Sequence, residues 1–120
     1  MAFTPKELLN QLMQTEGALC AALVDYNSGM LLESVGSGLD LELAAAGNTE
    51  VVRAKMKTMK SLGMQGAIED ILITLTQQYH IIRPVEKHDG LFIYYVLDRS
   101  RANLAMARRK VLEAEAQTAI

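Results

Sequence analysis

The chain has 120 residues, half of them apolar, and its twelve basic and fourteen acidic side chains leave a formal charge of −2. That length predicts one domain that buries about two thirds of its unfolded surface, which is enough for a core without disulfides. The charge balance argues against nonspecific binding to nucleic acid or to a membrane surface. A single cysteine excludes an internal disulfide framework. No basic-then-apolar leader opens the chain, and the longest apolar run, 18–24, is too short for membrane insertion, so we expect a soluble cytoplasmic protein.

The first predicted elements are a helix over residues 4–15 and a β-hairpin over residues 18–35. Thr4 suits the N-cap position, Pro5 suits the first helical position, and Glu7 completes a T-x-x-E capping box. The hairpin is indicated by two apolar runs on either side of an Asn-Ser-Gly turn.

A second helix, over residues 39–62 and capped by Asp40, is the dominant element of the chain. At 100° per residue its apolar arc covers about 200° of the cylinder, whereas a helix that docks on one sheet needs little more than about 100°. We therefore expect a second chain to cover the surplus, with Lys55 at the seam between the two contacts. The apolar side comprises Leu41, Ala45, Val52, Met56 and Met59, and the charged strip opposite comprises Glu42, Glu50, Arg53, Lys57 and Lys60.

The last third of the chain predicts an antiparallel meander of three strands over residues 68–97 and a helix over residues 99–115. Side chains alternate from Ile71 to Thr76 as in a half-buried strand, and Pro84 marks a bulge, an end or an edge. Asp98 or Ser100 is the expected cap of the last helix, and the tail after Glu115 is expected to fray. The order α-β-β-α-β-β-β-α predicts an α+β sandwich of two or three layers with a five-stranded antiparallel sheet.

This order, together with several local strings, resembles the roadblock/light-chain-seven family. The strings are Gly17-Ala18-Leu19 leading into Val24-Asp25-x-x-x-Gly29, the alanine-rich helix, Ile73-Thr74, and LDRSRANLAMAR over residues 97–108. The resemblance implies a profilin-like fold with strand order 2-1-5-4-3 and helices on both faces. It also implies dimers that pair their third strands edge to edge and pack their long helices together. The interface residues that follow are Leu41, Ala45, Val52, Lys55, Met56, Met59, Ile71, Leu72, Ile73 and Thr74.

The resemblance further implies that the partners are a second copy or a paralogous roadblock protein, and a small Ras-like GTPase. Family members act on GTPases, scaffold them, or serve as light chains of motor complexes. No arginine here stands out as an arginine finger, so the expected mode is stabilisation of the GTPase's own switch segments. The leading hypothesis is a dimeric regulatory or scaffold protein that is not itself an enzyme. The alternatives are a motor-complex light-chain-type adaptor and a small-molecule-sensing profilin/PAS-like module, for which the few aromatic residues predict a poor pocket.

Few side chains point to chemistry, and we predict no catalytic, cofactor-binding or metal-binding residue. Cys20 lies in an apolar strand, where a buried inert thiol is expected; a hydrolase that uses it as nucleophile would lack a base. His80 and His88 lack the spacing of metal ligands, and Gly36-Ser37-Gly38 lacks the lysine of a phosphate-binding loop.

Charged groups offer one candidate contact site. Arg101, Arg108 and Arg109 are predicted to lie broadly together on the last helix, as a solvated face or as a site for an acidic partner. Glu69-Asp70, before the third strand, is expected to be solvated.

Overall fold

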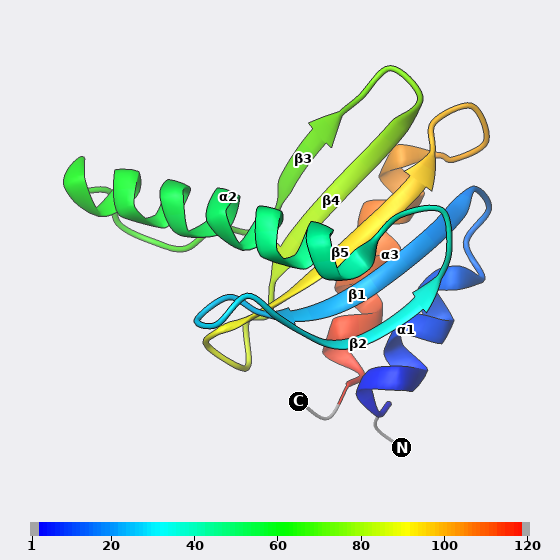
Figure 1. Ribbon diagram of the computed structural model, residues 1–120, viewed down its shortest axis with the longest axis horizontal. Helices are drawn as coiled ribbons and strands as arrows, with labels where there is room; N and C mark the ends of the chain where they lie inside the picture. Colours follow the sequence, from blue (N-terminus) through cyan, green and yellow to red (C-terminus); the bar gives the residue numbers. More distant parts are fainter. Residues whose placement is uncertain (1–2, 119–120) are drawn as a thin grey trace.

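The computed structural model describes residues 3–118 and has the predicted element order. Five antiparallel strands form one sheet in the order β2-β1-β5-β4-β3 (Figure 1). The elements are α1 (Pro5–Met13), β1 (Ala18–Asp25), β2 (Met30–Gly36), α2 (Leu41–Ser61), β3 (Ile71–Thr74), β4 (Gln78–Pro84), β5 (Leu91–Asp98) and α3 (Leu104–Ala116).

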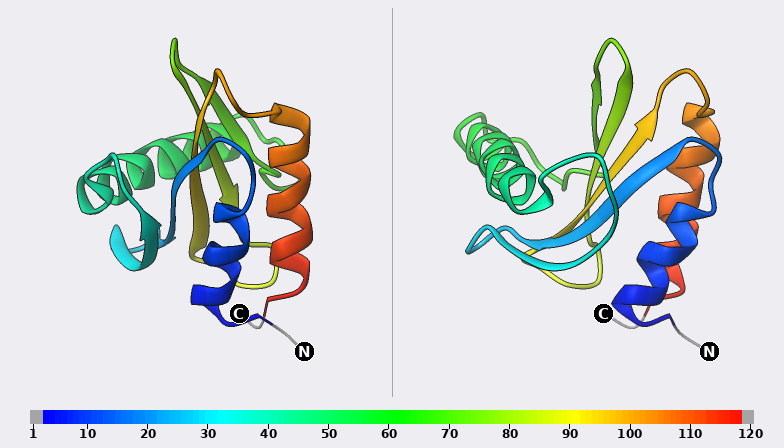
Figure 2. Two further views of the ribbon diagram at one scale, coloured as in Figure 1. Left: turned by 90° about the vertical axis from the view of Figure 1, so that its right-hand side faces the viewer. Right: turned by 45° about the vertical axis from the view of Figure 1, so that its right-hand side comes forward.

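Helices cover both faces of the sheet, so the molecule has three layers (Figure 2). α1 and α3 lie side by side on one face, and α2 crosses the other. The first half of α2 lies over β1 and β2, whereas its second half extends past the sheet (Figure 1). On the α2 side of the two outer strands, Ile82 of β4 is fully buried, whereas Ile71 and Ile73 of β3 are only half-buried.

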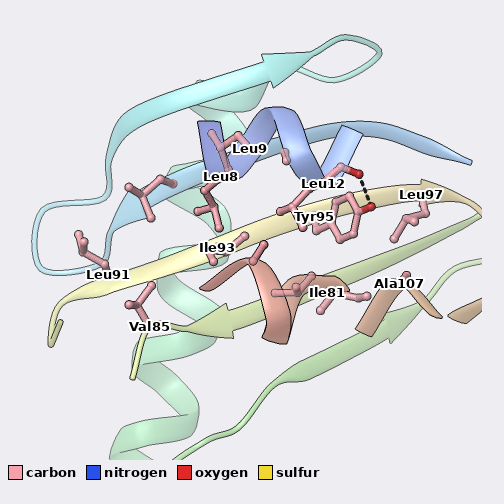
Figure 3. Close-up of a cluster of buried hydrophobic side chains, with 14 residues drawn as sticks. Leu8, Leu9, Leu12, Ile81, Val85, Leu91, Ile93, Tyr95, Leu97 and Ala107 are labelled. Carbon is pink, nitrogen blue, oxygen red and sulfur yellow. Dashed lines mark hydrogen bonds between the residues drawn. The ribbon is translucent and has the colours of Figure 1, made fainter. Parts of the chain in front are cut away.

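The larger of two cores lies between the sheet and the pair α1 and α3 (Figure 3). Leu8, Leu9 and Leu12 of α1 are fully buried there against Tyr95 of β5. The Tyr95 hydroxyl donates a hydrogen bond to the carbonyl oxygen of Leu12 at 2.6 Å, so its polar end is satisfied in the core. Burial of each such side chain stabilises the fold by about 1.5–3 kcal/mol.

Local signals in the sequence act as expected at the starts of α1 and α2. The capping box forms, with the Glu7 amide donating to Thr4 Oγ1 at 3.2 Å and the Thr4 amide donating to Glu7 Oε1 at 2.9 Å. The hydrogen bond from the Thr4 amide, together with the Thr4 side chain, lowers the pKa of the Glu7 carboxyl. Asp40 caps α2 by accepting a hydrogen bond from the Leu43 amide at 3.1 Å.

The start of α3 differs from the prediction, because its N-cap is Asn103 and neither Asp98 nor Ser100. Asp98 Oδ1 instead accepts hydrogen bonds from the amide and hydroxyl of Ser100, which lower the pKa of this carboxyl. The Ala102 amide donates to the Asp98 carbonyl at 2.9 Å. These bonds close a turn over residues 98–102 and delay the helix by five residues.

The C-terminal tail is better ordered than predicted as far as Thr118, which is only 3% exposed. Its hydroxyl donates to the Ala114 carbonyl at 2.6 Å. A parallel bridge joins it to Phe3, ahead of α1. The tail is held because it lies beside the N-terminal segment; residues 119 and 120 lie outside the described range.

Candidate interaction surface

The two edge strands of the sheet are protected to different degrees. On β2 the register with β1 skips Leu32, which is a bulge in the middle of the edge. The Lys6 ammonium of α1 reaches over this strand, donating to the Ser34 carbonyl oxygen at 2.8 Å and pairing with Glu33 at 3.4 Å. A bulge and a lysine at an edge are the usual obstacles to pairing with another chain.

The β3 edge has neither obstacle among the described residues. Its four residues pair with β4 in continuous register, from Ile71 opposite Ile82 to Thr74 opposite Tyr79. β4 is its sole neighbour in the sheet. Ile71 and Ile73 face the α2 side and are only half-buried. An apolar, regular edge of this kind is a template for another strand.

The overhanging part of α2 continues this apolar surface. Leu62 is 68% exposed and Met64, just beyond the helix, is 54% exposed. The β1–β2 turn lies against the opposite flank of the helix, since an added Cβ at Gly29 would lie 3.8 Å from Ala46 Cα. Helical spacing therefore turns Val51 and Leu62 toward the β3 side. Apolar side chains at the end of α2 and on the α2 side of β3 are therefore both partly open to solvent.

The structure divides the interface residues expected from the sequence into two groups. Ala45 and Val52 are at most 1% exposed, and Leu72 points into the α1/α3 core, so these side chains have little or no surface to offer a partner. The remaining positions have surface to offer: Leu41, Lys55, Met56, Met59, Ile71, Ile73 and Thr74 are half-buried or exposed.

A hydrogen-bonded polar chain lies at this surface, and spacing along the sequence did not reveal it. The Tyr94 hydroxyl donates to His80 Nδ1 at 2.8 Å, and His80 Nε2 donates to Gln78 Oε1 at 2.8 Å. This arrangement requires a neutral imidazole, and burial lowers the pKa of His80. Burial also raises the pKa of Tyr94 to about 12, against the opposing effect of the Asn48 side chain. Residues from neighbouring strands meet here through register, which no local motif encodes.

The structure places the thiol and the potential metal ligands that the sequence offered. Cys20 is fully buried, and burial raises the pKa of its thiol to about 11, so the reactive thiolate is disfavoured. No group of three or more potential metal ligands occurs between residues 3 and 118. A hollow of about 660 Å³ at one end of the sheet is lined by Leu19 and six polar residues, which is unlike an apolar ligand pocket.

The arginines that were expected to form one patch are mostly engaged separately. Arg108 binds Asp70 through two hydrogen bonds of 2.9 and 3.0 Å, so Asp70 is not simply solvated as predicted. Arg109 pairs with Glu113 on its own helix at 3.2 Å, and Arg101 lies in the turn before α3. Four of the cations without an ion pair within residues 3–118 lie together on the second half of α2: Arg53, Lys55, Lys57 and Lys60. The other four, Lys87, Arg99, Arg101 and Lys110, are spread over the rest of the described chain.

In the described part of the chain, none of the helices combines the length and the apolar character needed to cross a membrane.

No protein-family model matches this chain, and no curated protein matches it by sequence. Solved structures do match its fold. A Roadblock/LC7 domain from Streptomyces avermitilis superposes with a TM-score of 0.79 at 14% identity, over 91% of this chain and 89% of that one. Myxococcus xanthus MglB gives a TM-score of 0.76 at 18% identity, over 94% and 86% of the two chains. The gliding protein MglB from Thermus thermophilus gives 0.78 at 18% identity, over 91% and 81%. The chain has the Roadblock/LC7 fold, which confirms the fold expected from the resemblance.

Proposed function

We propose that this protein is a dimeric regulatory or scaffold protein that binds a small Ras-like GTPase in the cytoplasm and is not itself an enzyme. The observation that carries the proposal is the contrast between the two edges of the sheet. β2 is protected by a bulge and by Lys6, whereas β3 is regular, apolar and open beside an overhanging helix. An apolar edge without a bulge or a charged side chain over it is a template for another strand, which supports β3 as the pairing edge.

Pairing of two copies through β3 would cover both the open edge of β3 and the overhanging half of α2. Two antiparallel β3 edges related by a two-fold axis form a closed interface, so the assembly stops at a dimer and does not grow into a fibre. The overhanging half of each α2 would then lie over the half-buried Ile71 and Ile73 of the partner chain. A solved structure described as MglB with tetrameric arrangement shares this fold with a TM-score of 0.78, which supports self-association for this chain as well.

The GTPase partner is proposed from the family resemblance and from the charge of α2. The four cations on its second half make no ion pair among the described residues, which makes them available to an acidic surface. The sequence offers no evident arginine finger, so the proposed action is on the GTPase's own switch segments. An adaptor role in a larger complex would use the same surfaces and differs only in the partner.

Two measurements test the proposal in order. Sedimentation velocity over a range of protein concentrations should show a dimer of this 13.2 kDa chain. Titration with purified small GTPases from the same cell, each loaded with GTP or with GDP, should then show binding that depends on the nucleotide. A chain that stays monomeric at high concentration would refute the dimer, and binding to none of the GTPases in either state would refute the GTPase role.

A further inference from the structure

An ion pair from α3 and a hydrogen bond from β4 hold the segment that leads into the open edge strand. Arg108 of α3 holds Asp70 with both of its bonding nitrogens, Nε at 2.9 Å and Nη2 at 3.0 Å. Arg83 of β4 donates through Nη1 to the Glu69 carbonyl oxygen at 2.9 Å and through Nε to Glu115 Oε1 at 2.6 Å. Residues 69 and 70 are thus both held from the α3 side of the sheet.

The position of Asp70 makes its contact significant, because β3 begins at the next residue. β3 is four residues long and has one neighbouring strand. Short edge strands with few contacts are the parts of a fold that open most easily. The linker from α2 also contains Gly63 and Gly66, both at positive φ, so the chain entering β3 has little rigidity of its own.

Arg108 differs from its neighbour on the same helix. The Asp70 carboxylate is only 17% exposed, and its bidentate contact spans 38 residues of sequence. Arg109 is 76% exposed and pairs with Glu113 one turn away, so its contact fixes nothing outside α3. A bidentate arginine–carboxylate pair fixes orientation as well as distance, whereas an exposed pair within one helix contributes little.

We propose that Arg108 is a positioning residue that holds β3 in the conformation that pairs with another chain, by clamping Asp70 from the opposite face of the sheet. This rests on the proposed function, since it assigns to Arg108 a role in the pairing edge described above. Loss of the clamp leaves the core intact, because neither side chain belongs to it. The strand would spend more time detached from β4.

Hydrogen exchange of the Ile71–Thr74 amides tests the clamp directly. In Arg108→Gln these amides should exchange about tenfold faster, which corresponds to about 1.4 kcal/mol of local stability. Amides of β1 and β5 should keep their protection. Arg109→Gln removes the same charge from the same helix and should leave β3 unchanged. Unchanged β3 exchange in Arg108→Gln, or equal acceleration in both variants, would overturn the proposal.

Self-association provides the second readout. If β3 is open about a sixth of the time in the wild type, tenfold more opening lowers the pairing-competent fraction from about five sixths to about a third in each of two chains, and the apparent Kd of the dimer rises about sixfold. The reversed pair Asp70→Arg with Arg108→Asp should restore both the protection of β3 and the Kd. Faster β3 exchange with an unchanged Kd would overturn the role of Arg108 in pairing. A monomeric wild-type chain would refute the proposed function, while the exchange measurement would still decide whether Arg108 holds the strand.

Discussion

Ile73→Lys is the most direct perturbation of the proposed pairing edge. Ile73 lies in the middle of β3, opposite His80 of β4, and faces the α2 side with its side chain half-buried. In the monomer a lysine there can extend its ammonium to water past the edge, so the fold should survive. In a dimer the same ammonium would lie under the partner's α2, where it has no acidic side chain to bind.

The expected loss follows from the surface that Ile73 still exposes. Burial of a whole isoleucine side chain stabilises by about 1.5–3 kcal/mol, so the half that remains for a partner is worth about 1 kcal/mol. A two-fold interface contains two copies, so about 2 kcal/mol is lost before any cost of desolvating two ammonium groups. The dimer Kd should therefore rise at least about thirtyfold.

Sedimentation velocity across a concentration series measures this Kd, and far-UV circular dichroism verifies the fold of each variant. Leu32→Lys is the matched control, because Leu32 is an exposed bulge residue on the protected edge. It should leave the Kd unchanged. A dimer of Ile73→Lys as tight as the wild type, or equal weakening by Leu32→Lys, would refute the assignment of β3 as the pairing edge.

Three further predictions concern stability. Gly36→Ala should unfold at a much lower urea concentration than Gly38→Ala. Both residues have positive φ, which costs about 1–2 kcal/mol for alanine, but a Cβ at Gly36 would also lie 2.6 Å from Cys20 Cα, whereas a Cβ at Gly38 would meet open space. Equal losses of stability in the two variants would contradict this prediction. His80 has a lowered pKa in the folded protein, so below pH 6.5, the usual pKa of the group, the unfolded chain binds more protons than the folded one. The free energy of unfolding should therefore decrease as the pH is lowered below 6.5. His80→Gln should flatten this limb in urea titrations at successive pH values and His88→Gln, in an exposed turn, should not; a limb that persists in His80→Gln would rule the imidazole out as its source. Cys20→Ser should lower the free energy of unfolding by about 1–3 kcal/mol, because it buries a hydroxyl among apolar side chains. It should leave self-association intact. Loss of association in a folded variant would give the thiol a role that its burial does not predict.

Local sequence was sufficient wherever one turn of chain contains both the signal and its partner. The Thr4–Glu7 capping box, the Asp40 cap and the hairpin of β1 and β2 all formed at the predicted places. The predicted start of α3 was wrong because the local signal was ambiguous. The Asp98 side chain can accept hydrogen bonds either as a helix cap or within a turn, and its hydrogen bonds with Ser100 form a turn.

The surface was only half predictable. The breadth of the apolar arc on α2 correctly indicated more apolar surface than one sheet covers, since Leu62 remains exposed at the overhanging end. The arc did not indicate which side faced inward, and Ala45 and Val52 proved to be buried in the chain's own core. Helical periodicity gives relative directions around an axis, but it contains no reference to the sheet.

The sequence by itself determined the kinds of element, their order and the apolar character of β3 and α2, because these depend on residues a few positions apart. Only the tertiary structure decided that β2 is obstructed and β3 is bare, and that Arg108 reaches Asp70 across 38 residues. Strand register and long-range ion pairs are set by how whole layers pack, so the free energy that selects them belongs to the assembled fold and to no local stretch of chain.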